Sequence, residues 1–545
     1  MRSMRLFLLF SFSTLMLLDA YGFTFTDETD RKALLDFKSQ VSEDKQDVLS
    51  SWNNSFPLCN WRGVTCGLKH KRVTGLDLGG WQLGGVGNLF RLEYLDMSGN
   101  ILRGDIPVGL FNCSRLMKLY LLENHIGGGV PSELGSLAKL KILNLEGGIP
   151  DALARLTQLV SLGLALNKFS GAFPPSIYNI SSLKFLSMFG NGFSGSLKPD
   201  FGNLLPNLRY LNMGRNNFTG PIPTTFSTIA NLQHLAIVWN KMTGSIPITS
   251  HYSSGDLGFI KALANCTQLH TLLVNRNRLG GDLPTSITNL STNLWKLDLG
   301  RNFISGTIPY DIGNLISLQK LRLDENLLTG PLPSSIGKLS SLVLLNLTLS
   351  GELPSSLGNI TRLEQLYLSS NSFEGAVPPS LGHCKYILYL WIGSNKLNGT
   401  IPQEIMQIQS LVYLNLSDNS LTGSLPKYIK PLERLCTLSV EHNKLSGKLP
   451  QVLGDCLSVE NLYLQGNFFD GDIPNIKGLM GAKRLDFSNN NLFGSIPGYF
   501  ANFSHLEYLN LSINSFEGEV PTEGKFQNAT VVTVFGNKGV EASRN

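Results

Sequence analysis

Two groups of regularly spaced residues carry side chains suited to binding a ligand. The first group occupies one repeated position of the chain and reads Arg215, Trp239, Arg276 and Arg301, followed by Glu325. Guanidinium groups bind carboxylates through paired hydrogen bonds, and Arg and Trp supply much of the energy of protein interfaces. We therefore expect these residues to form one column of outward strand positions that binds an acidic or carboxylate-bearing peptide. The alternative is an ordinary solvated surface.

The second group is aromatic. Tyr367 and Trp391 stand at equivalent positions of successive repeats, and Tyr463 stands at the same position farther along the chain. Such a stripe is suited to contact with a ligand or with a partner protein. The alternative is that these are the aromatic side chains that strand surfaces commonly carry.

No pattern of catalytic or metal-binding residues accompanies these groups. Ser417-Asp418-Asn419 and Ser181-Ser182-Leu183-Lys184 match parts of the penicillin-binding-protein motifs, but the Lys-Thr-Gly of that set is missing. The eight histidines lack metal-ligand spacing. With 16% charged residues and a net charge of +5, the chain also lacks the clustered basic patch of a nucleic-acid binder. We expect no enzyme, no cofactor, no metal and no nucleic-acid partner.

A nine-residue pattern, LxxLxLxxN, positions both groups. It runs from Leu92 to Asn100 and then recurs, mostly 23 to 25 residues apart, which is typical of leucine-rich repeats. The pattern predicts an α/β solenoid, a horseshoe or superhelix with parallel strands on its concave face and short helical turns on its convex face. Solenoids offer long binding surfaces, so the fold favours recognition as the function. The recurring asparagines are Asn100, Asn124, Asn167, Asn191, Asn216, Asn240, Asn277, Asn302, Asn326, Asn371, Asn395, Asn419, Asn443, Asn467, Asn490 and Asn514.

The asparagine column is expected to be structural. In the first full unit, Leu95 and Met97 should face the core, and the amide of Asn100 should satisfy backbone groups where the chain turns away. Four of the seven cysteines also recur at one repeat position, where other repeats place Leu, and should be buried core residues. These are Cys113, Cys266, Cys384 and Cys456. Cys59 and Cys66 are close in sequence and are predicted to form a disulfide.

The chain divides into four predicted segments. Residues 1–22 combine Arg2 and Arg5 with a short apolar run, which is typical of a secretory signal peptide. Residues 23–72 form an N-terminal cap, residues 73–530 about 19 repeats, three of them truncated, and residues 531–545 a truncated C-terminal tail. No membrane span is expected in this chain, so it should be secreted or lie at the extracellular face of the plasma membrane.

Potential N-glycosylation sequons agree with an extracellular location. The sequon at Asn346, like those at Asn415 and Asn510, falls on a predicted strand of the concave face. The predicted glycosylation sites are Asn53, Asn112, Asn179, Asn217, Asn265, Asn289, Asn346, Asn359, Asn398, Asn502 and Asn528.

Three units depart from the repeat length. The stretch around Leu143 to Pro150 and the stretch around Leu345 to Leu349 have each lost the asparagine turn, and the first unit has Trp81 in the asparagine column. Because repeats contact only their neighbours, such defects should stay local. We expect weak points at these units.

Several motifs together resemble plant leucine-rich-repeat receptor-like kinases. They are the run from Asp30 to Lys38, Ser51-Trp52-Asn53, the segment from Cys59 to Cys66, and the repeated LxGxIP. Phe201 to Leu208, Asp311 to Leu315 and Phe526 to Thr530 are similar to the subgroup that includes the receptor for bacterial elongation factor Tu.

The resemblance covers Asp27 to about Asn537 and implies an ectodomain that binds a ligand and recruits a co-receptor. Family members usually continue into a paired-cysteine cap, a membrane span and a kinase. This chain ends shortly after Gly536-Asn537 and shows no kinase motif. We therefore carry no kinase role over to any residue.

The predicted function is extracellular recognition of a peptide or protein, together with a co-receptor, in plant immune sensing. Two alternatives stay open. One is a secreted inhibitor of an extracellular hydrolase, and the other is a non-functional receptor remnant, which the shortened units suggest.

Overall fold

The structure is a computed structural model that describes most of the chain beyond residue 26. The described residues are 27–40, 47–67, 71–78, 91–100, 103–104, 106, 108–121, 124–126, 131–145, 149–243, 257–426 and 432–541. The predicted signal peptide and the shortened first unit around Trp81 lie outside them. The chain forms two compact units, an N-terminal unit up to Thr243 and a C-terminal unit from Gly244. Each is described by itself.

The N-terminal unit begins with a cap built on tryptophan. The cap consists of α1 (Asp27–Gln40), η2 (Val48–Ser51), η3 (Leu58–Asn60) and β1 (Val64–Cys66), which pairs antiparallel with β2 (Val73–Asp77). Trp52 and Trp61 are each 1% exposed and stack with ring centroids 5.6 Å apart. The predicted disulfide between Cys59 and Cys66 is confirmed, with Cα atoms 5.5 Å apart.

In the repeats of the N-terminal unit, the LxL segment of each pattern forms a short parallel strand. The leucine at the centre of each strand stands beside that of the next, as Leu186 does beside Leu211. Both are fully buried, so the strands stack one layer of core side chains on another. The strands are β2, β3 (Tyr94–Asp96), β5 (Lys118–Tyr120), β7 (Ile142–Asn144), β8 (Ser161–Gly163), β10 (Phe185–Ser187), β12 (Tyr210–Asn212) and β14 (His234–Ala236).

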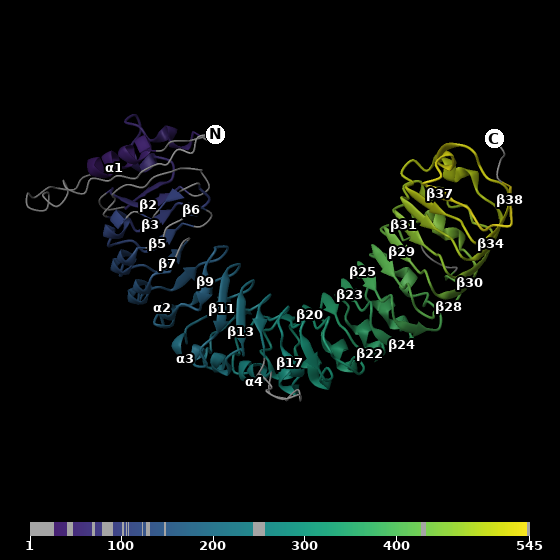
Figure 1. The fold of residues 1–545 in the computed structure, drawn as a ribbon, viewed down its shortest axis with the longest axis horizontal. Helices are drawn as coiled ribbons and strands as arrows, with labels where there is room; N and C mark the ends of the chain where they lie inside the picture. The colour runs from purple at the N-terminus through teal and green to yellow at the C-terminus, as the bar shows by residue number, and fades with distance from the viewer. Residues whose placement is uncertain are drawn as a thin grey trace, which may run out of the picture. The chain divides into compact units, whose positions relative to one another are not determined.

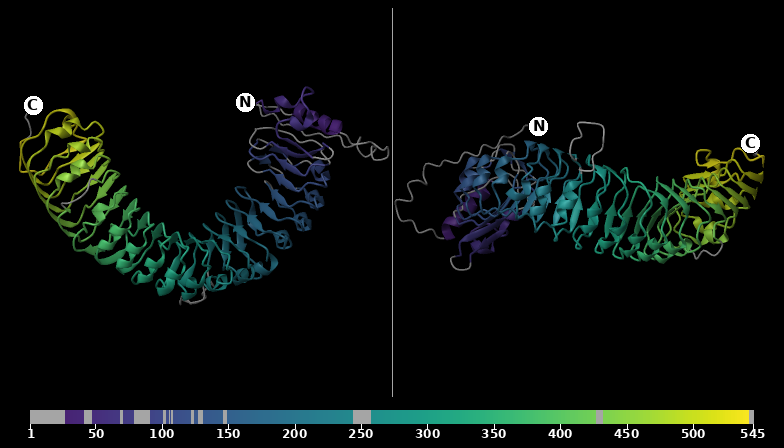
Figure 2. Two further views of the ribbon diagram at one scale, coloured as in Figure 1. Left: turned by 180° about the vertical axis from the view of Figure 1, so that it is seen from behind. Right: turned by 90° about the horizontal axis from the view of Figure 1, so that it is seen from below.

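A second set of strands follows each asparagine, and short helices close each repeat on the side away from the main sheet (Figures 1 and 2). The second strands are β4 (Arg103–Gly104), β6 (His125–Ile126), β9 (Ser170–Ala172), β11 (Gly192–Ser196), β13 (Asn217–Gly220) and β15 (Lys241–Met242). The helices are η4 (Val108–Asn112), η5 (Ser132–Ser136), η6 (Asp151–Arg155), α2 (Pro175–Tyr178), α3 (Phe201–Leu204) and η7 (Thr224–Thr228).

The C-terminal unit repeats this architecture. Its main parallel strands are β16 (Thr271–Leu273), β18 (Lys296–Asp298), β20 (Lys320–Arg322), β21 (Leu344–Asn346), β23 (Gln365–Tyr367), β25 (Tyr389–Trp391), β27 (Tyr413–Asn415), β29 (Thr437–Ser439), β31 (Asn461–Tyr463), β33 (Arg484–Asp486), β35 (Tyr508–Asn510) and β37 (Val532–Thr533).

The outer elements of this unit again lie away from the main sheet. The second strands are β17 (Gly280–Asp282), β19 (Phe303–Ser305), β22 (Ser350–Glu352), β24 (Ser372–Ala376), β26 (Lys396–Asn398), β28 (Thr422–Gly423), β30 (Lys444–Lys448), β32 (Phe468–Gly471), β34 (Asn491–Ser495), β36 (Ser515–Glu519) and β38 (Gly539–Glu541). The helices are α4 (Gly258–Leu263), η8 (Thr285–Asn289), η9 (Tyr310–Asn314), η10 (Ser334–Lys338), η11 (Ser355–Asn359), η12 (Pro379–His383), η13 (Ile405–Gln407), η14 (Gln451–Asp455), η15 (Lys477–Leu479), η16 (Gly498–Asn502) and η17 (Gly524–Gln527).

The asparagine of each repeat ties neighbouring repeats together. The Asn216 Nδ2 donates to the carbonyl of Met213 in its own repeat (3.1 Å) and to that of Met188 in the preceding one (2.8 Å). Its Oδ1 accepts the backbone N–H of Phe193 (3.1 Å). One side chain thus satisfies three buried backbone groups of the turn, which confirms the structural role of the column.

The asparagine ladder extends beyond the predicted end of the repeats at residue 530. Asn537 Nδ2 donates to the carbonyls of Leu511 (2.9 Å) and Val534 (2.8 Å), and its Oδ1 accepts the N–H of Phe516 (3.1 Å). The strands β37 and β38 pair with β35 and β36 in parallel. Residues 531–541 therefore form the start of a further repeat, so treating them only as a tail was wrong. The signal was Gly536-Asn537, one repeat length after Asn514.

The shortened repeat around Leu345 is held by hydroxyl groups in place of its missing turn. The Oγ1 of Thr348 accepts the backbone N–H of Glu325 (2.8 Å), whereas the equivalent N–H of Arg301 bonds to the carbonyl of Asp324. Ser350 Oγ likewise accepts the N–H of Gly330 (3.1 Å). The Asn371 side chain still reaches back to the carbonyl of Leu347 (3.0 Å). The loss of residues at this unit is thus accommodated within the hydrogen-bond pattern of its neighbours.

We expect Thr348→Val to lower the free energy of unfolding of the C-terminal unit by about 1 kcal/mol, because the Glu325 N–H loses its acceptor. Chemical denaturation of the secreted protein measures this. The substitution also removes the sequon of Asn346, so Asn346→Gln serves as the control that removes the sequon alone. Equal stability of wild type and Thr348→Val would contradict the role of the hydroxyl.

Candidate functional site

The first predicted column lies in turns, and its assignment to strand positions was wrong. Arg215 and Trp239 of the N-terminal unit and Arg276 and Arg301 of the C-terminal unit each directly precede a ladder asparagine. Their φ angles lie between 51° and 57°. The chain must turn away from the sheet before the asparagine, and the left-handed conformation makes this turn. The sequence pattern could not show this, because Arg and Trp have no preference for such a conformation.

In the N-terminal unit, Arg215 is held between two aromatic rings. The guanidinium carbon lies 5.4 Å from the ring centroid of Phe189 and 5.4 Å from that of Trp239. Both are cation–π contacts with side chains of the adjoining repeats. Trp239 is 46% exposed, so the cluster lies at the surface. Phe189 was not predicted from the sequence, because its role depends on the turn that brings Arg215 beside it.

The strands next to Arg215 carry a stack of flat rings and a row of small side chains. Phe185, Tyr210 and His234 stack in succession, with 4.4 Å between neighbouring centroids and interplanar angles of 10° and 5°. Two residues farther along these strands stand Ser187, Asn212 and Ala236, of which Ser187 is 9% and Ala236 3% exposed. The row of small side chains therefore lies between the ring stack and the cluster of Arg215.

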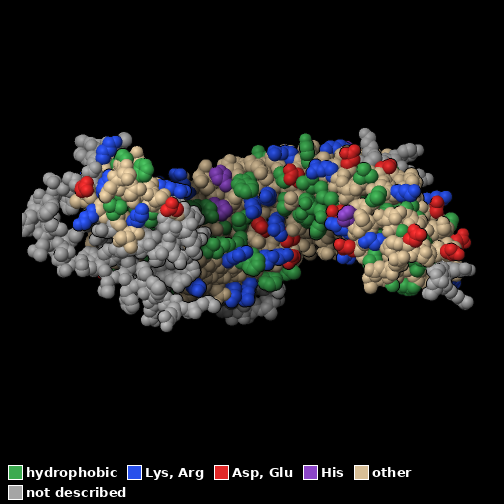
Figure 3. Space-filling view, turned by 90° about the horizontal axis from the view of Figure 1, so that it is seen from above, with side chains coloured by type: hydrophobic (Ala, Val, Ile, Leu, Met, Phe, Trp, Pro, Cys, Tyr) green, Lys and Arg blue, Asp and Glu red, His purple; other side chains and the backbone are tan. Residues whose placement is uncertain are grey.

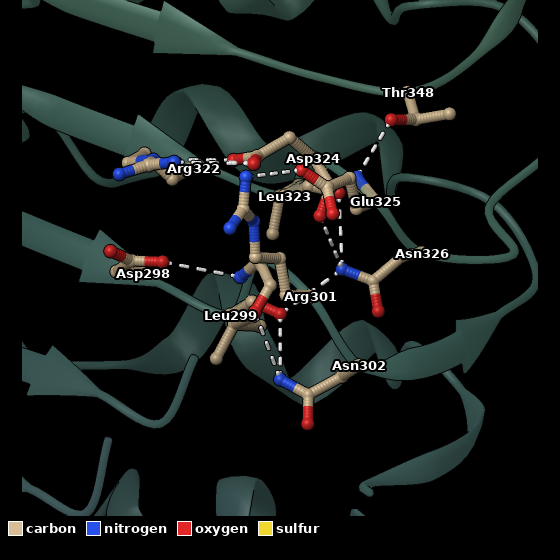
Figure 4. Close-up of polar contacts among 11 residues, drawn as sticks. Asp298, Leu299, Arg301, Asn302, Arg322, Leu323, Asp324, Glu325, Asn326 and Thr348 are labelled. Atoms are coloured by element: carbon tan, nitrogen blue, oxygen red, sulfur yellow. Dashed lines mark hydrogen bonds and ion pairs between the residues drawn. The ribbon is translucent and has the colours of Figure 1, made fainter. Parts of the chain in front are cut away.

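In the C-terminal unit, the arginines near Arg301 are paired with acids of the same chain (Figure 4). Arg301 Nη2 lies 2.6 Å from Glu325 Oε1. Arg322 donates from Nε and Nη2 to the two carboxylate oxygens of Asp324, each at 3.2 Å. Glu325 was seen in the sequence only as the end of the column, and Arg322 and Asp324 were missed. The sequence did offer a signal for this ion pair, because Arg322 ends β20 and Asp324 follows it by two residues.

A buried carboxylate completes this charged cluster. Asp298, at the end of β18, is 6% exposed and stands beside Arg322 in the parallel register. Burial raises its pKa from 3.8 to about 6, although Arg322 and the Gly300 N–H, which donates to Oδ1 at 3.2 Å, both favour the charged form. Lys296, Arg322 and Asp324 are the other charged groups that act on it.

The raised pKa predicts how stability changes with pH. Asp298 binds its proton more tightly in the folded state than in the unfolded state. Its proton therefore contributes fully to the free energy of unfolding below pH 3.8, and this contribution is lost as pH rises through about 6. As the pH is raised from 4 to 7, we expect the free energy of unfolding of Asp298→Asn to rise by about 3 kcal/mol relative to that of the wild type. Denaturant unfolding at a series of pH values tests this, with Asp282→Asn, an exposed acid on β17, as control. If the free energies of unfolding of Asp298→Asn and wild type differed by the same amount at every pH, the raised pKa of Asp298 would be ruled out.

The second predicted group, by contrast, lies on strands as expected. Tyr367 on β23 and Trp391 on β25 are register partners, and their rings meet edge to face with centroids 5.3 Å apart. Tyr389 and Tyr413 stack beside them at 5.3 Å, so the patch is wider than the sequence suggested. Trp391 is 40% exposed. Tyr463 occupies the same strand position on β31.

The predicted glycosylation sites fall on different faces, and their modification stays a prediction. Six share one repeat position, exposed at or just after the end of an outer helix, whereas Asn217 and Asn398 are exposed on second strands. Asn346 is half-buried on β21, between Arg322 and Tyr367 in the register. The six are Asn112, Asn179, Asn265, Asn289, Asn359 and Asn502. Asn53 lies in the cap, and Asn528 follows η17.

The recurring cysteines are core residues, as predicted. Cys113 and Cys456 are each 2% exposed, and Cys266 and Cys384 are fully buried. Burial raises the thiol pKa of Cys266 and of Cys384 to about 11, so these thiols are poor nucleophiles at neutral pH.

Comparison with known protein families identifies the cap and the repeats. The Leucine rich repeat N-terminal domain matches residues 27–67. The Leucine Rich Repeat family matches residues 91–113, 182–204, 207–229, 293–315, 317–339, 362–384, 410–432 and 482–503. The cap and its repeats define a leucine-rich-repeat solenoid.

Comparison with individual proteins shows which leucine-rich-repeat proteins this chain is similar to. The LRR receptor-like serine/threonine-protein kinase EFR of Arabidopsis thaliana is 51% identical over 390 residues, covering 54% of this chain and 36% of that protein. The Arabidopsis receptor kinase HAESA, solved with the peptide hormone IDA and the co-receptor SERK1, is 31% identical with a TM-score of 0.77, covering 95% of this chain and 94% of that one. The plant peptide hormone receptor RGFR1, solved with RGF2, is 33% identical with a TM-score of 0.78. This match covers 89% of this chain and 76% of that one.

The chain belongs to the family of plant leucine-rich-repeat receptor-like kinases and corresponds to their ectodomain. It spans about a third of the length of EFR. Ectodomains of this family lie on the extracellular side of the membrane, and the chain is extracellular. Within the part of the chain that the structure describes, none of the helices has the length and apolar character of a membrane span.

Proposed function

We propose that this chain recognises a peptide or protein ligand outside the cell and, once the ligand is bound, a co-receptor ectodomain, in plant immune signalling. Its similarity to the HAESA ectodomain, which was solved with a peptide hormone and SERK1, supports a ligand and a co-receptor. The motifs that resemble the subgroup of the receptor for bacterial elongation factor Tu support an immune role.

One structural observation carries this proposal. The strands and turns of the main sheet expose large aromatic side chains, notably Trp239 at 46% and Trp391 at 40%. The cores of these repeats are complete without them, since the neighbouring Leu235 and Leu390 are fully buried. Exposed Trp beside Arg or Tyr is typical of a surface that becomes buried in a complex.

The test is ligand-dependent assembly. The secreted chain is immobilised, and the SERK1 ectodomain is passed over it in the presence of peptide fractions from bacterial culture or from plant extracellular fluid. We expect SERK1 to associate only with an active fraction, and protease treatment of that fraction to abolish the effect. An active bacterial fraction supports the immune role, and an active plant fraction favours a hormone receptor.

Two outcomes contradict the proposal. Association of SERK1 in the absence of any fraction would remove the need for a ligand. Failure of every fraction to act, together with inhibition of an extracellular hydrolase by the chain, would favour the inhibitor function instead. The variant Trp391→Ala, which leaves the core leucines in place, is the first surface change to test in an active assay.

A further inference from the structure

The strand side of the N-terminal unit from β8 to β14 is cationic. Residues 151–243 contain only two acidic residues, Asp151 and Asp200. Asp151 begins η6, and Asp200 directly precedes α3, so both stand next to the outer helices. The exposed Lys184 and Arg209, in contrast, directly precede the strands β10 and β12. Figure 3 shows Lys and Arg side chains beside hydrophobic and His side chains on the side viewed from above.

The turns at the end of these strands add further positive charge. Arg215 lies in one turn, and the exposed Lys168 and Lys241 directly follow the ladder asparagines of two other repeats. No carboxylate of the described strands and turns from β8 to β14 offsets these cations. A field of one sign over a solvent-facing surface attracts ligands of the opposite sign.

Within this surface, Arg215 differs from the arginines of the C-terminal unit. Arg301 and Arg322 are already paired with Glu325 and Asp324 at 2.6 and 3.2 Å. The side chain of Arg215 forms no ion pair or hydrogen bond with another described residue, and its contacts are the rings of Phe189 and Trp239. The rings restrain the guanidinium, and the side chain of Arg215 is exposed. A restrained guanidinium loses less entropy when it binds a carboxylate.

The neighbouring strands carry a row of small side chains beside this cluster. The row of Ser187, Asn212 and Ala236 consists of small side chains, and larger rings flank it on the side of Tyr210 and His234. An extended peptide laid across the strands can place its backbone over the small side chains and an apolar side chain against Trp239.

We propose that this surface, centred on Arg215, binds a carboxylate of an extended peptide whose neighbouring side chain is apolar or aromatic. The inference rests on the proposed function and names the class of ligand group. The carboxylate comes either from a Glu or Asp side chain or from the C-terminus of the peptide. Charge complementarity favours an acidic segment, since the surface itself supplies only cations.

Surface plasmon resonance with synthetic peptides tests the proposal. The secreted full chain is captured, and four heptapeptides are passed over it at concentrations up to the millimolar range. The first is acetyl-Gly-Glu-Phe-Gly-Glu-Phe-Gly-amide, which has only side-chain carboxylates. The second replaces Glu by Gln. The third keeps Gln but ends in a free carboxylate, and the fourth combines Glu with the free carboxylate.

We expect binding by peptides with a carboxylate, and the first and third peptides show which source is preferred. Arg215→Gln should weaken this binding about tenfold or more, since one lost charge-assisted pair changes affinity by at least that factor. Arg215→Lys keeps the charge but not the planar stacking, so it should retain only part of the wild-type affinity for these peptides. Arg301→Gln, at the equivalent turn position but in an ion pair, should stay within about twofold of wild type.

The proposal is overturned if the Gln-amide peptide binds as well as the Glu peptides, or if Arg215→Gln binds like wild type. Equal losses in Arg215→Gln and Arg301→Gln overturn it as well. Circular dichroism and elution volume verify that each variant is folded. If no peptide binds the wild-type chain, this inference fails, while the assembly assay with SERK1 still decides the proposed function independently.

Discussion

Replacing Asp30 by Asn is expected to lower the free energy of unfolding of the N-terminal cap by about 3 to 5 kcal/mol, because the substitution breaks a buried ion pair. Asp30 Oδ1 lies 2.5 Å from Arg72 Nη2, and both side chains are 6% exposed. Asp30 Oδ2 also accepts Arg72 Nε (2.7 Å) and the backbone N–H of Val73 (2.9 Å). One carboxylate thus fastens α1 to the first strand of the repeats.

Hydrogen exchange of the amides in β1 and β2 measures this effect locally, and limited proteolysis within α1 gives a second measure. Glu28→Gln is the matched control, since Glu28 lies on the same helix and is exposed. We expect the control to change stability by less than about 0.5 kcal/mol. Similar protection in both variants would show that α1 is held by its apolar contacts, chiefly the buried Leu34, and not by the ion pair.

Replacing Asn326 by Ala should lower the free energy of unfolding of the C-terminal unit by about 3 to 5 kcal/mol, because four backbone groups each lose a hydrogen bond at once. The Nδ2 group of Asn326 donates to the carbonyls of Leu299 (3.0 Å), Leu323 (3.1 Å) and Asp324 (3.3 Å). Its Oδ1 accepts the N–H of Ile304 at 3.0 Å. Asn326 is 9% exposed, so water does not readily replace these bonds.

Denaturant unfolding followed by tyrosine and tryptophan fluorescence measures this loss. Asn314→Ala is the control, because Asn314 is exposed at the end of η9 and has no part in the ladder. We expect hydrogen exchange to increase most in the turns next to residue 326, since repeats are coupled mainly to their neighbours. If the two alanine variants were equally stable, the ladder would contribute little beyond the packing of the leucines.

Much of the fold could be predicted from local spacing. The leucines of the pattern are the buried residues, the recurring cysteines are core residues, and Cys59 pairs with Cys66. The prediction ended too early at residue 530, because the segment after Phe526 lacks the leucines on which the pattern depends, and only Gly536-Asn537 marks the further turn. The shortened unit around Leu345 was expected to be weak, yet Thr348 supplies a hydrogen bond in place of the lost turn.

The candidate site was predicted less well. The sequence placed Arg215 and Arg301 in the same column and treated them alike, but the structure separates them. Arg215 stands between Phe189 and Trp239, whereas Arg301 is paired with Glu325. This difference depends on side chains contributed by adjoining repeats, and no rule of spacing within one repeat contains it.

The order and content of the repeats follow from the sequence alone, because a strand with leucines on alternate positions and an asparagine at its end has one stable way to stack on its neighbour. The direction of each turn side chain and its partner were decided only by the folded chain. A left-handed turn before the asparagine projects Arg215, Trp239 and Arg301 from the sheet. The side chain of the next repeat then determines whether an arginine is neutralised or left to bind a ligand.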